Sequence, residues 1–241
     1  MDLIDWPVAI LAGGLATRLR PLTAQLPKAL LPVAGEPFLR HQLRLLYSRG
    51  IRRVVLCVGH LGEVIQTAFG ESTAEGMRID YSFDGPRLLG TGGALKRALP
   101  KLGERFFVLY GDSYLPIDYG KVAQAFLTSR KHGLMTVIKN ENRWDKSNVE
   151  FDGQEIRRYN KTHPNDKMRY IDYGLGVLRA SALANWPQKA PFDLADVYEE
   201  LLRTSQLAGF EVTQRFYEIG SPAGLNELEQ VLANKLKPVS K

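Results

Sequence analysis

The chain has 241 residues, of which 44% are hydrophobic, so it can bury a full core and fits one large domain. Its 32 Lys and Arg against 26 Asp and Glu give a net charge of +6, but no basic run exceeds two consecutive residues, so we predict neither nucleic-acid nor membrane binding. The single Cys57 excludes an intrachain disulfide and a cysteine-based metal site.

The N-terminus begins with acidic residues and reaches glycine at position 13, so it lacks the basic region and the cleavage site of a signal peptide. No apolar run approaches the length that spans a membrane. We therefore expect a soluble cytoplasmic protein that is a monomer or a homodimer.

The first half alternates between two kinds of pattern. Three short, continuous apolar runs predict strands buried on both faces: Val8–Leu11, Arg53–Val58 and Arg105–Tyr110. Amphipathic segments predict the helices that separate or follow them: residues 38–49, 63–69 and 92–99. This alternation implies parallel strands joined by right-handed crossovers, and therefore an α/β fold of three layers.

The second half is richer in strand patterns. Two alternating runs, "NVEF" and "QEIRRY", are joined by Asp152–Gly153, which predicts a β-hairpin with a two-residue turn. The run "MRYIDYGLGVL" predicts a further strand, and such additions indicate a small β-rich lid on the sheet. No linker or repeat divides the chain, so we predict a single domain over residues 1–236 and a flexible tail over residues 237–241.

A glycine-rich stretch follows the first strand. The strand ends at Leu11, and Ala12, Gly13 and Gly14 let the backbone turn so that successive N–H groups can bind a phosphate. Arg18 and Lys28 follow with no carboxylate between them, and such cations suit a nucleoside triphosphate, which carries roughly four negative charges. The alternative is an ordinary strand-to-loop turn with solvated cations.

The longer string "LAGGLATRLRPLTAQLPKALLPVAGEPFL" resembles the signature of the sugar-1-phosphate nucleotidylyltransferases. The segments "LLGTGGAL", "VLYGDSYL" and "YEIGSPAGLNE" are similar to other parts of that family, so the resemblance covers most of residues 7 to 232. It implies a Rossmann-like three-layer αβα sandwich with a mixed central sheet. It also implies an enzyme that joins a nucleoside triphosphate to a sugar 1-phosphate and releases pyrophosphate.

The resemblance also implies roles for individual residues. Arg18, Lys28, Asp112 and Lys161 would be catalytic. The nucleotide would be bound by Leu11, Ala12, Gly13, Gly14, Thr17, Arg18, Lys28, Asp84, Gly90 and Thr91. For Asp84, contact with a base edge and capping of a turn both stay open.

The sugar phosphate and a metal ion complete the implied site. The sugar phosphate would be bound by Asp112, Asn160, Lys161, Asp172 and Gly174. The cofactor Mg²⁺ would be held by Asp112 and Glu218, because glutamate, in place of the family's usual aspartate, can still ligate the ion. For Lys161 the alternative is one more solvated cation on a basic hairpin.

The resemblance is greatest to the mannose- and heptose-1-phosphate guanylyltransferases, which favours GTP as the donor. A thymidylyl, uridylyl or cytidylyl donor is the alternative, as is a catalytically silent relative that binds a nucleotide sugar and regulates a partner. The departures that motivate the silent relative are Ala16 at a glycine position, the altered "YNK" and Glu218. We further predict that the backbone at Ala16 takes a conformation accessible to alanine.

Overall fold

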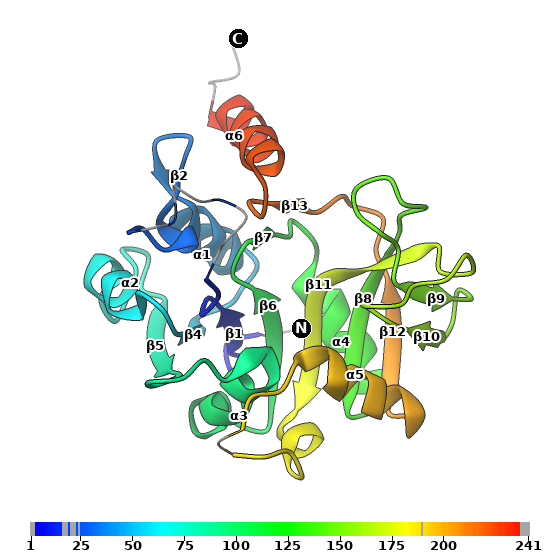
Figure 1. The fold of residues 1–241 in the computed structure, drawn as a ribbon. Helices are drawn as coiled ribbons and strands as arrows, with labels where there is room; N and C mark the ends of the chain where they lie inside the picture. Colours follow the sequence, from blue (N-terminus) through cyan, green and yellow to red (C-terminus); the bar gives the residue numbers. More distant parts are fainter. Residues whose placement is uncertain (1–2, 16–18, 20–22, 24, 189, 237–241) are drawn as a thin grey trace.

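The computed structural model describes residues 3–15, 19, 23, 25–188 and 190–236. A mixed sheet of nine strands lies between helices on both faces, which confirms the predicted α/β sandwich (Figure 1). The strands of this sheet are β1 (Val8–Leu11), β4 (Arg53–Val58), β5 (Arg78–Phe83), β6 (Arg105–Tyr110), β8 (Gly133–Lys139), β9 (Val149–Phe151), β10 (Ile156–Tyr159), β11 (Tyr170–Arg179) and β12 (Leu207–Glu211).

The helices are α1 (Phe38–Ser48), α2 (Gly62–Phe69), α3 (Gly90–Leu102), α4 (Tyr119–Ser129), α5 (Leu194–Arg203) and α6 (Pro222–Leu236), with short 3₁₀ helices η2 (Lys28–Leu30) and η3 (Ala180–Leu183). Two small antiparallel pairs lie outside the large sheet: β2 (Pro32–Val33) with β3 (Glu36–Pro37), and β7 (Ser113–Tyr114) with β13 (Tyr217–Glu218). The predicted helices of the first half are therefore all present.

Strand β1 lies between β4 and β6 and is parallel to both. Leu11, at its end, pairs with Cys57 of β4 and with Tyr110 of β6, so the three strands end level with one another. Strand β5 continues the parallel part beyond β4, whereas β11 pairs with β6 in the antiparallel sense. The loops that follow β1, β4, β5 and β6 consequently meet at one edge of the sheet.

Each central strand sends alternate side chains into two different hydrophobic cores, because successive residues of a strand point to opposite faces. In β4, Val54 and Leu56 join the core under α1, α2 and α4, while Val55 and Cys57 join the core under α3 and α5. This two-sided burial explains why these strands appear in the sequence as continuous apolar runs.

The predicted hairpin forms, but its turn is longer than expected. Strands β9 and β10 are joined by residues 152–155, and the two-residue turn predicted at Asp152–Gly153 is wrong. The carboxylate Oδ1 of Asp152 accepts bonds from the N–H groups of Gln154 (2.9 Å) and Glu155 (2.8 Å), which stabilises the wider loop. The hairpin joins the central sheet where Val149 pairs with Tyr170 of β11.

The C-terminal helix α6 lies at one end of the molecule, above β13 and beside β2 (Figure 1). Its Leu228 and Leu232 pack in a third core with Phe38 of α1, Tyr114 of β7 and Ile219. Helix α6 therefore packs against both small strand pairs. The predicted tail at residues 237–241 lies outside the described residues.

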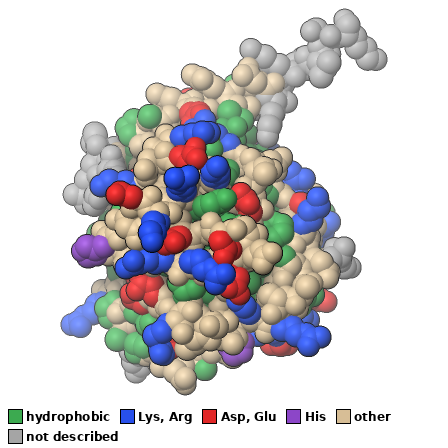
Figure 2. Space-filling model, turned by 90° about the vertical axis from the view of Figure 1, so that its right-hand side faces the viewer, with side chains coloured by type: hydrophobic (Ala, Val, Ile, Leu, Met, Phe, Trp, Pro, Cys, Tyr) green, Lys and Arg blue, Asp and Glu red, His purple; other side chains and the backbone are tan. Residues whose placement is uncertain are grey.

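Charges of both signs are interspersed on the face that contains the hairpin (Figure 2). Arg157, for example, pairs with Asp152 at 2.6 Å and with Glu155 at 2.7 Å. Among the helices of the described chain, none is both long enough and apolar enough to cross a bilayer.

Candidate active site

A cleft of about 340 Å³ opens at the edge of the sheet where the parallel strands end. It collects residues that are far apart in the sequence, and ten of the residues predicted for the site line it: Leu11, Ala12, Gly13, Gly14, Lys28, Asp84, Gly90, Thr91, Asp112 and Lys161. Thr17 and Arg18 lie outside the described residues, as does Ala16, so the predictions for them stay predictions.

Glycines let the loops that follow β1, β4 and β6 approach one another closely. A Cβ atom on Gly111 would lie 2.6 Å from the carbonyl oxygen of Leu11, and one on Gly59 would lie 2.9 Å from that of Gly13. Real Cβ atoms do not approach backbone so closely, so a side chain at either position would push the loops apart. The floor of the cleft is therefore made of backbone.

The cation and the carboxylate predicted to be catalytic form an ion pair. Lys28 begins the 3₁₀ helix η2, and its Nζ lies 2.9 Å from Oδ2 of Asp112 in the loop between β6 and β7. The two side chains are 21% and 31% exposed, so solvent and ligands reach both of them. Each group neutralises the other in this structure, and an incoming phosphate can compete for Lys28.

Asp84, directly after β5, is a buried carboxylate in the wall of the cleft. Its Oδ2 accepts a bond from the N–H of Leu89 at 3.2 Å, so the turn-capping role left open from the sequence is present. Burial raises the pKa of the Asp84 carboxyl, although that bond and the charge of Arg97 oppose the increase. Leu88 borders the same wall and is 40% exposed.

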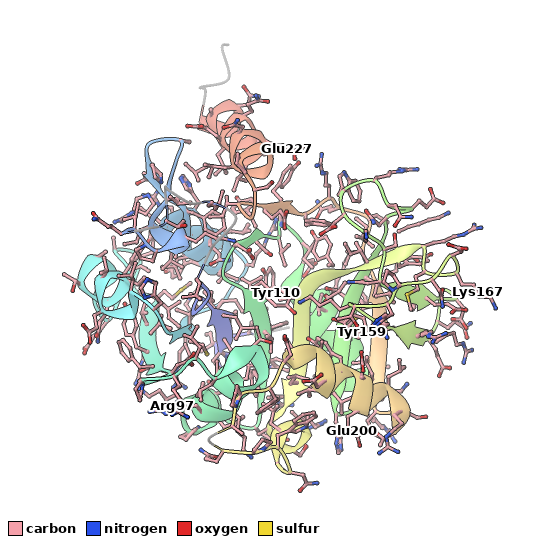
Figure 3. All side chains as sticks on the ribbon, in the orientation of Figure 1. Arg97, Tyr110, Tyr159, Lys167, Glu200 and Glu227 are labelled. Carbon is pink, nitrogen blue, oxygen red and sulfur yellow. The ribbon has the colours of Figure 1, made fainter. Side chains whose placement is uncertain are left out.

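Lys161 and the half-buried Tyr110 both line the cleft, whereas Asp172 lies near them without lining it. The Nζ of Lys161 lies 5.8 Å from the ring centre of Tyr110, which appears near the middle of Figure 3. Burial raises the pKa of Asp172 to about 6, although a bond from the N–H of Gly174 (2.9 Å) and the charge of Lys161 oppose it. Burial also keeps the Tyr110 hydroxyl protonated, because its pKa lies well above the usual range.

The carboxamide of Asn160 shapes the turn that carries Lys161. Its Oδ1 accepts bonds from the N–H groups of Thr162 (3.0 Å) and His163 (2.6 Å). A residue that the sequence analysis missed, Asn148, supports the same region: its carbonyl accepts from the N–H of Asn160 (3.0 Å) and its Oδ1 accepts from the N–H of Asp172 (2.9 Å). Asn148 thus links the backbones of two residues predicted to bind the sugar phosphate.

The loop before α5 fixes the start of helix α3, where Gly90 and Thr91 lie. Gly90 has φ +72°, and a Cβ there would lie 2.5 Å from the carbonyl oxygen of Phe192. The Thr91 hydroxyl donates to the carboxylate of Asp193 and accepts from the N–H of Leu194 (2.7 Å). Thr91 therefore lines the cleft, while its hydroxyl forms hydrogen bonds with Asp193 and Leu194 at the N-terminus of α5.

The two carboxylates predicted to hold a metal ion lie on backbone segments that are hydrogen-bonded to each other. Glu218 of β13 pairs with Ser113 of β7, and the N–H of Ile219 donates to the carbonyl of Asp112 at 2.9 Å. Among the described residues, no group of three or more His, Cys, Asp or Glu side chains could hold a metal. Two carboxylates supplemented by substrate phosphates nevertheless fit the oxygen ligands that Mg²⁺ prefers.

Sequence reasoning missed the remaining residues of the lining: Ala29, Cys57, Leu88, Ala94, Tyr110 and Gly111. Tyr110 is the last residue of one predicted strand and Cys57 is the penultimate residue of another, so their place at the shared edge was a usable signal. Burial raises the pKa of the Cys57 thiol to about 12, so this residue does not supply a thiolate nucleophile at neutral pH.

Comparison with known proteins identifies the family of the chain. The family model described as nucleotidyl transferase matches residues 8–158, which is more than half of the chain. The chain belongs to the nucleotidyl transferase family. Members of this family are enzymes, and the resemblance found in the sequence is confirmed at this level.

Relatives of this nucleotidyl transferase differ in the nucleotide that they are named for. It is 28% identical to D-glycero-alpha-D-manno-heptose 1-phosphate guanylyltransferase of Campylobacter jejuni, over 88% of this chain and 94% of the relative. It is 32% identical to UTP--glucose-1-phosphate uridylyltransferase of a Synechocystis strain, over 54% of this chain but only 36% of that protein. Its fold is similar to that of HddC from Yersinia pseudotuberculosis complexed with GMP-PN (TM-score 0.78, 22% identity, 94% and 99% of the two chains).

We expect Lys28→Ala to lower the turnover of this nucleotidyl transferase more than tenfold without unfolding it, because a partly exposed cation of the cleft is lost and the core is untouched. Steady-state rates and thermal melting test this, with Lys121→Ala on the exposed face of α4 as the control. Unchanged turnover would remove Lys28 from the site. We expect the same loss for Arg18→Ala from the sequence pattern.

The raised pKa of Asp172 predicts a pH-dependent stability. Because its pKa is about 6 when folded and ordinarily 3.8, the folded state bears a cost for the ionised form that is fully present above pH 6 and is relieved as the pH falls toward 4. Asp172→Asn should therefore raise the free energy of unfolding by about 3 kcal/mol at pH 7.5 and by much less at pH 4.5.

Urea unfolding of both proteins at the two pH values checks this, with Asp166→Asn at an exposed position as the control. An equal effect of Asp172→Asn at both pH values would contradict the raised pKa.

Proposed function

We propose that the chain transfers a guanylyl group from GTP to a sugar 1-phosphate and releases pyrophosphate. The observation that carries the proposal is that one cleft contains a buried carboxylate, Asp84, together with the Lys28–Asp112 pair and Lys161. The Asp84 carboxylate can accept hydrogen bonds from a base with adjacent N–H donors. The cations Lys28 and Lys161 can bind phosphates. Membership of the nucleotidyl transferase family supports the reaction class.

In the proposed reaction, an oxygen of the sugar phosphate forms a bond to the α-phosphorus of GTP. The bond from that phosphorus to the oxygen bridging to the β-phosphate breaks, and its electron pair leaves with pyrophosphate. The attacking oxygen is already ionised at neutral pH, because the second pKa of a phosphate monoester is near 6, so no general base is needed. Repulsion between the two anions is the main barrier to the reaction. In this proposal the positive charges of Lys28, Arg18 and Lys161 reduce that repulsion.

We further propose Mg²⁺ as the cofactor, held by Asp112 and Glu218. When bound, the ion would supply positive charge against the triphosphate. The hydrogen-bonded backbones of the two residues and the solvent access to Asp112 support this assignment.

The preference for GTP follows from the hydrogen-bonding edges of the bases. Guanine carries an N1–H and an exocyclic N2–H₂ side by side, so both can donate to one carboxylate, as in Asp84. Uracil and thymine present a single N–H between two carbonyl oxygens, which a carboxylate would repel. The guanylyltransferase relative supports the same choice, while the uridylyltransferase relative keeps a uridylyl donor as the alternative.

A pyrophosphate-release screen tests the proposal directly. GTP, UTP, dTTP, CTP and ATP are each combined with a panel of hexose and heptose 1-phosphates, and products are identified by mass spectrometry. The proposal requires GTP to give the highest kcat/KM. Release with a different triphosphate would overturn the choice of base, and binding of nucleotide sugars without any turnover would identify a silent relative.

We expect Asp84→Asn to reverse a preference for GTP over xanthosine triphosphate. The amide oxygen can still accept from the N–H of Leu89 and from N1–H of the base, while its NH₂ opposes N2–H₂ of guanine and donates to O2 of xanthine. The ratio of kcat/KM for the two nucleotides should change by about 10- to 100-fold, since a bidentate base contact contributes roughly 1–3 kcal/mol.

The control for this substitution is Asp80→Asn. Asp80 is also on β5, but its carboxylate pairs with Arg53 (2.8 Å) and Arg78 (2.9 Å) outside the cleft. If Asp84→Asn weakened the use of both nucleotides equally, Asp84 would serve only to hold the turn at Leu89.

A further inference from the structure

The loop that carries Asp112 is tied to helix α1 by a buried glutamine. Gln42, a residue that is only 1% exposed, lies in the middle of α1. Its Nε2 donates to the carbonyl oxygen of Tyr110 at 3.2 Å and to that of Ser113 at 2.8 Å. These two carbonyls flank Asp112, so one side-chain NH₂ group bridges the loop on both sides of the candidate catalytic carboxylate.

Other hydrogen bonds fix the same short segment. The N–H of Gly111 donates to the carbonyl of Leu11 at 3.0 Å, and the carbonyl of Asp112 accepts from the N–H of Ile219 at 2.9 Å. The backbone around Asp112 is thus bonded to β1, to the segment after β13 and to α1. The bonds to β1 and to the segment after β13 join backbone groups, whereas Gln42 of α1 donates its two bonds from a side chain.

The bond from Gln42 to Ser113 is buried and the bond to Tyr110 is partly buried, so both are costly to lose. A carbonyl left without a partner inside a protein costs roughly 1–3 kcal/mol, so removal of the NH₂ group would favour rearrangement of residues 110–113. That movement would displace the Asp112 carboxylate from Lys28, whose Nζ lies 2.9 Å away. It would also separate Asp112 from the neighbouring strand β13, which carries Glu218.

We propose that Gln42 is a positioning residue that holds the Asp112 carboxylate in the geometry that the reaction requires. It does not reach the substrate itself and acts through the carbonyls of Tyr110 and Ser113. The inference rests on the proposed function, because it assumes that the Asp112 carboxylate takes part in the reaction.

The neighbouring residue provides a matched control. His41 also lies on α1, its side chain is largely buried, and a ring nitrogen lies 2.7 Å from the carbonyl oxygen of Val33 in β2. Both residues therefore join α1 to a backbone carbonyl, and only the bonds of Gln42 reach the Asp112 loop. A role of Gln42 limited to packing would make the two residues equivalent.

The first test compares Gln42→Met with His41→Met. Methionine keeps the length and approximate volume of glutamine and removes both donors. For Gln42→Met we expect kcat to fall at least tenfold, the KM for GTP to stay within about twofold, and the affinity for Mn²⁺ in the presence of GTP, measured by electron paramagnetic resonance, to fall several-fold. For His41→Met we expect a lower melting temperature with kcat and Mn²⁺ affinity close to wild type.

The second test uses Gln42→Glu, which keeps the shape of the side chain and can donate only when it is protonated. Burial beside two carbonyls raises the pKa of such a carboxyl, so we expect the ratio of its kcat to that of wild type to rise as the pH is lowered from 8 to 6. A packing role predicts a ratio that does not change with pH. This variant keeps the proposal testable if Gln42→Met does not fold.

A third variant separates this inference from the proposed function. Asp112→Asn should lose turnover and Mn²⁺ affinity, and wild-type values for it would overturn the role of Asp112 itself. If Asp112→Asn loses both while Gln42→Met matches His41→Met, or the ratio for Gln42→Glu is independent of pH, the positioning role of Gln42 is wrong.

Discussion

The parallel pairing of β1 with β4 and β6 is the constraint on which the rest of the site depends. Because the three strands end level with one another, the loops that follow them must share one small region at the edge of the sheet. Only glycine fits where these loops meet, as at Gly59 and Gly111. As a result, backbone groups form part of the cleft lining, and Lys28, Asp84 and Asp112 reach the cleft from three different segments.

Charge balance then governs what this edge of the sheet can bind. Lys28 and Asp112 neutralise each other, and Lys161 lies beside the ring of Tyr110 and near the half-buried Asp172. The paired charges partly offset one another, and both lysines remain cations that an anionic group can bind. Because the pKa of Asp172 is raised, its ionised carboxylate lowers the stability of the fold at neutral pH.

Residues of the second half of the chain pack against segments that contain predicted site residues. The loop before α5 packs Phe192 against the start of α3, where Trp186 stacks on it at 4.7 Å between ring centres. On the opposite side, Arg215 pairs with Glu227 of α6 at 2.5 Å and lies 5.1 Å from the ring of Trp144. These contacts hold the segments that lead to Gly90 and to Glu218.

The sequence by itself determined three of the parallel strands at the centre of the sheet, but it did not predict the fourth, β5. Arg53–Val58 and Arg105–Tyr110 were predicted with their observed bounds, because a strand buried on both faces must be a continuous apolar run. The glycine-rich loop, Lys28, Asp84, Asp112 and Lys161 were identified from several short segments that resemble the family, and those that the structure describes line one cleft.

Only the tertiary structure decided which groups support those residues. Gln42 appears in the sequence as one polar position of an amphipathic helix, and its partners are 68 and 71 residues away. Phe192 bonds to backbone groups about 100 residues away, and Asn148 bonds to the backbones of Asn160 and Asp172 on neighbouring strands or turns. A local pattern records periodicity and chemical type, whereas these roles arise from contacts between segments that the chain brings together only on folding.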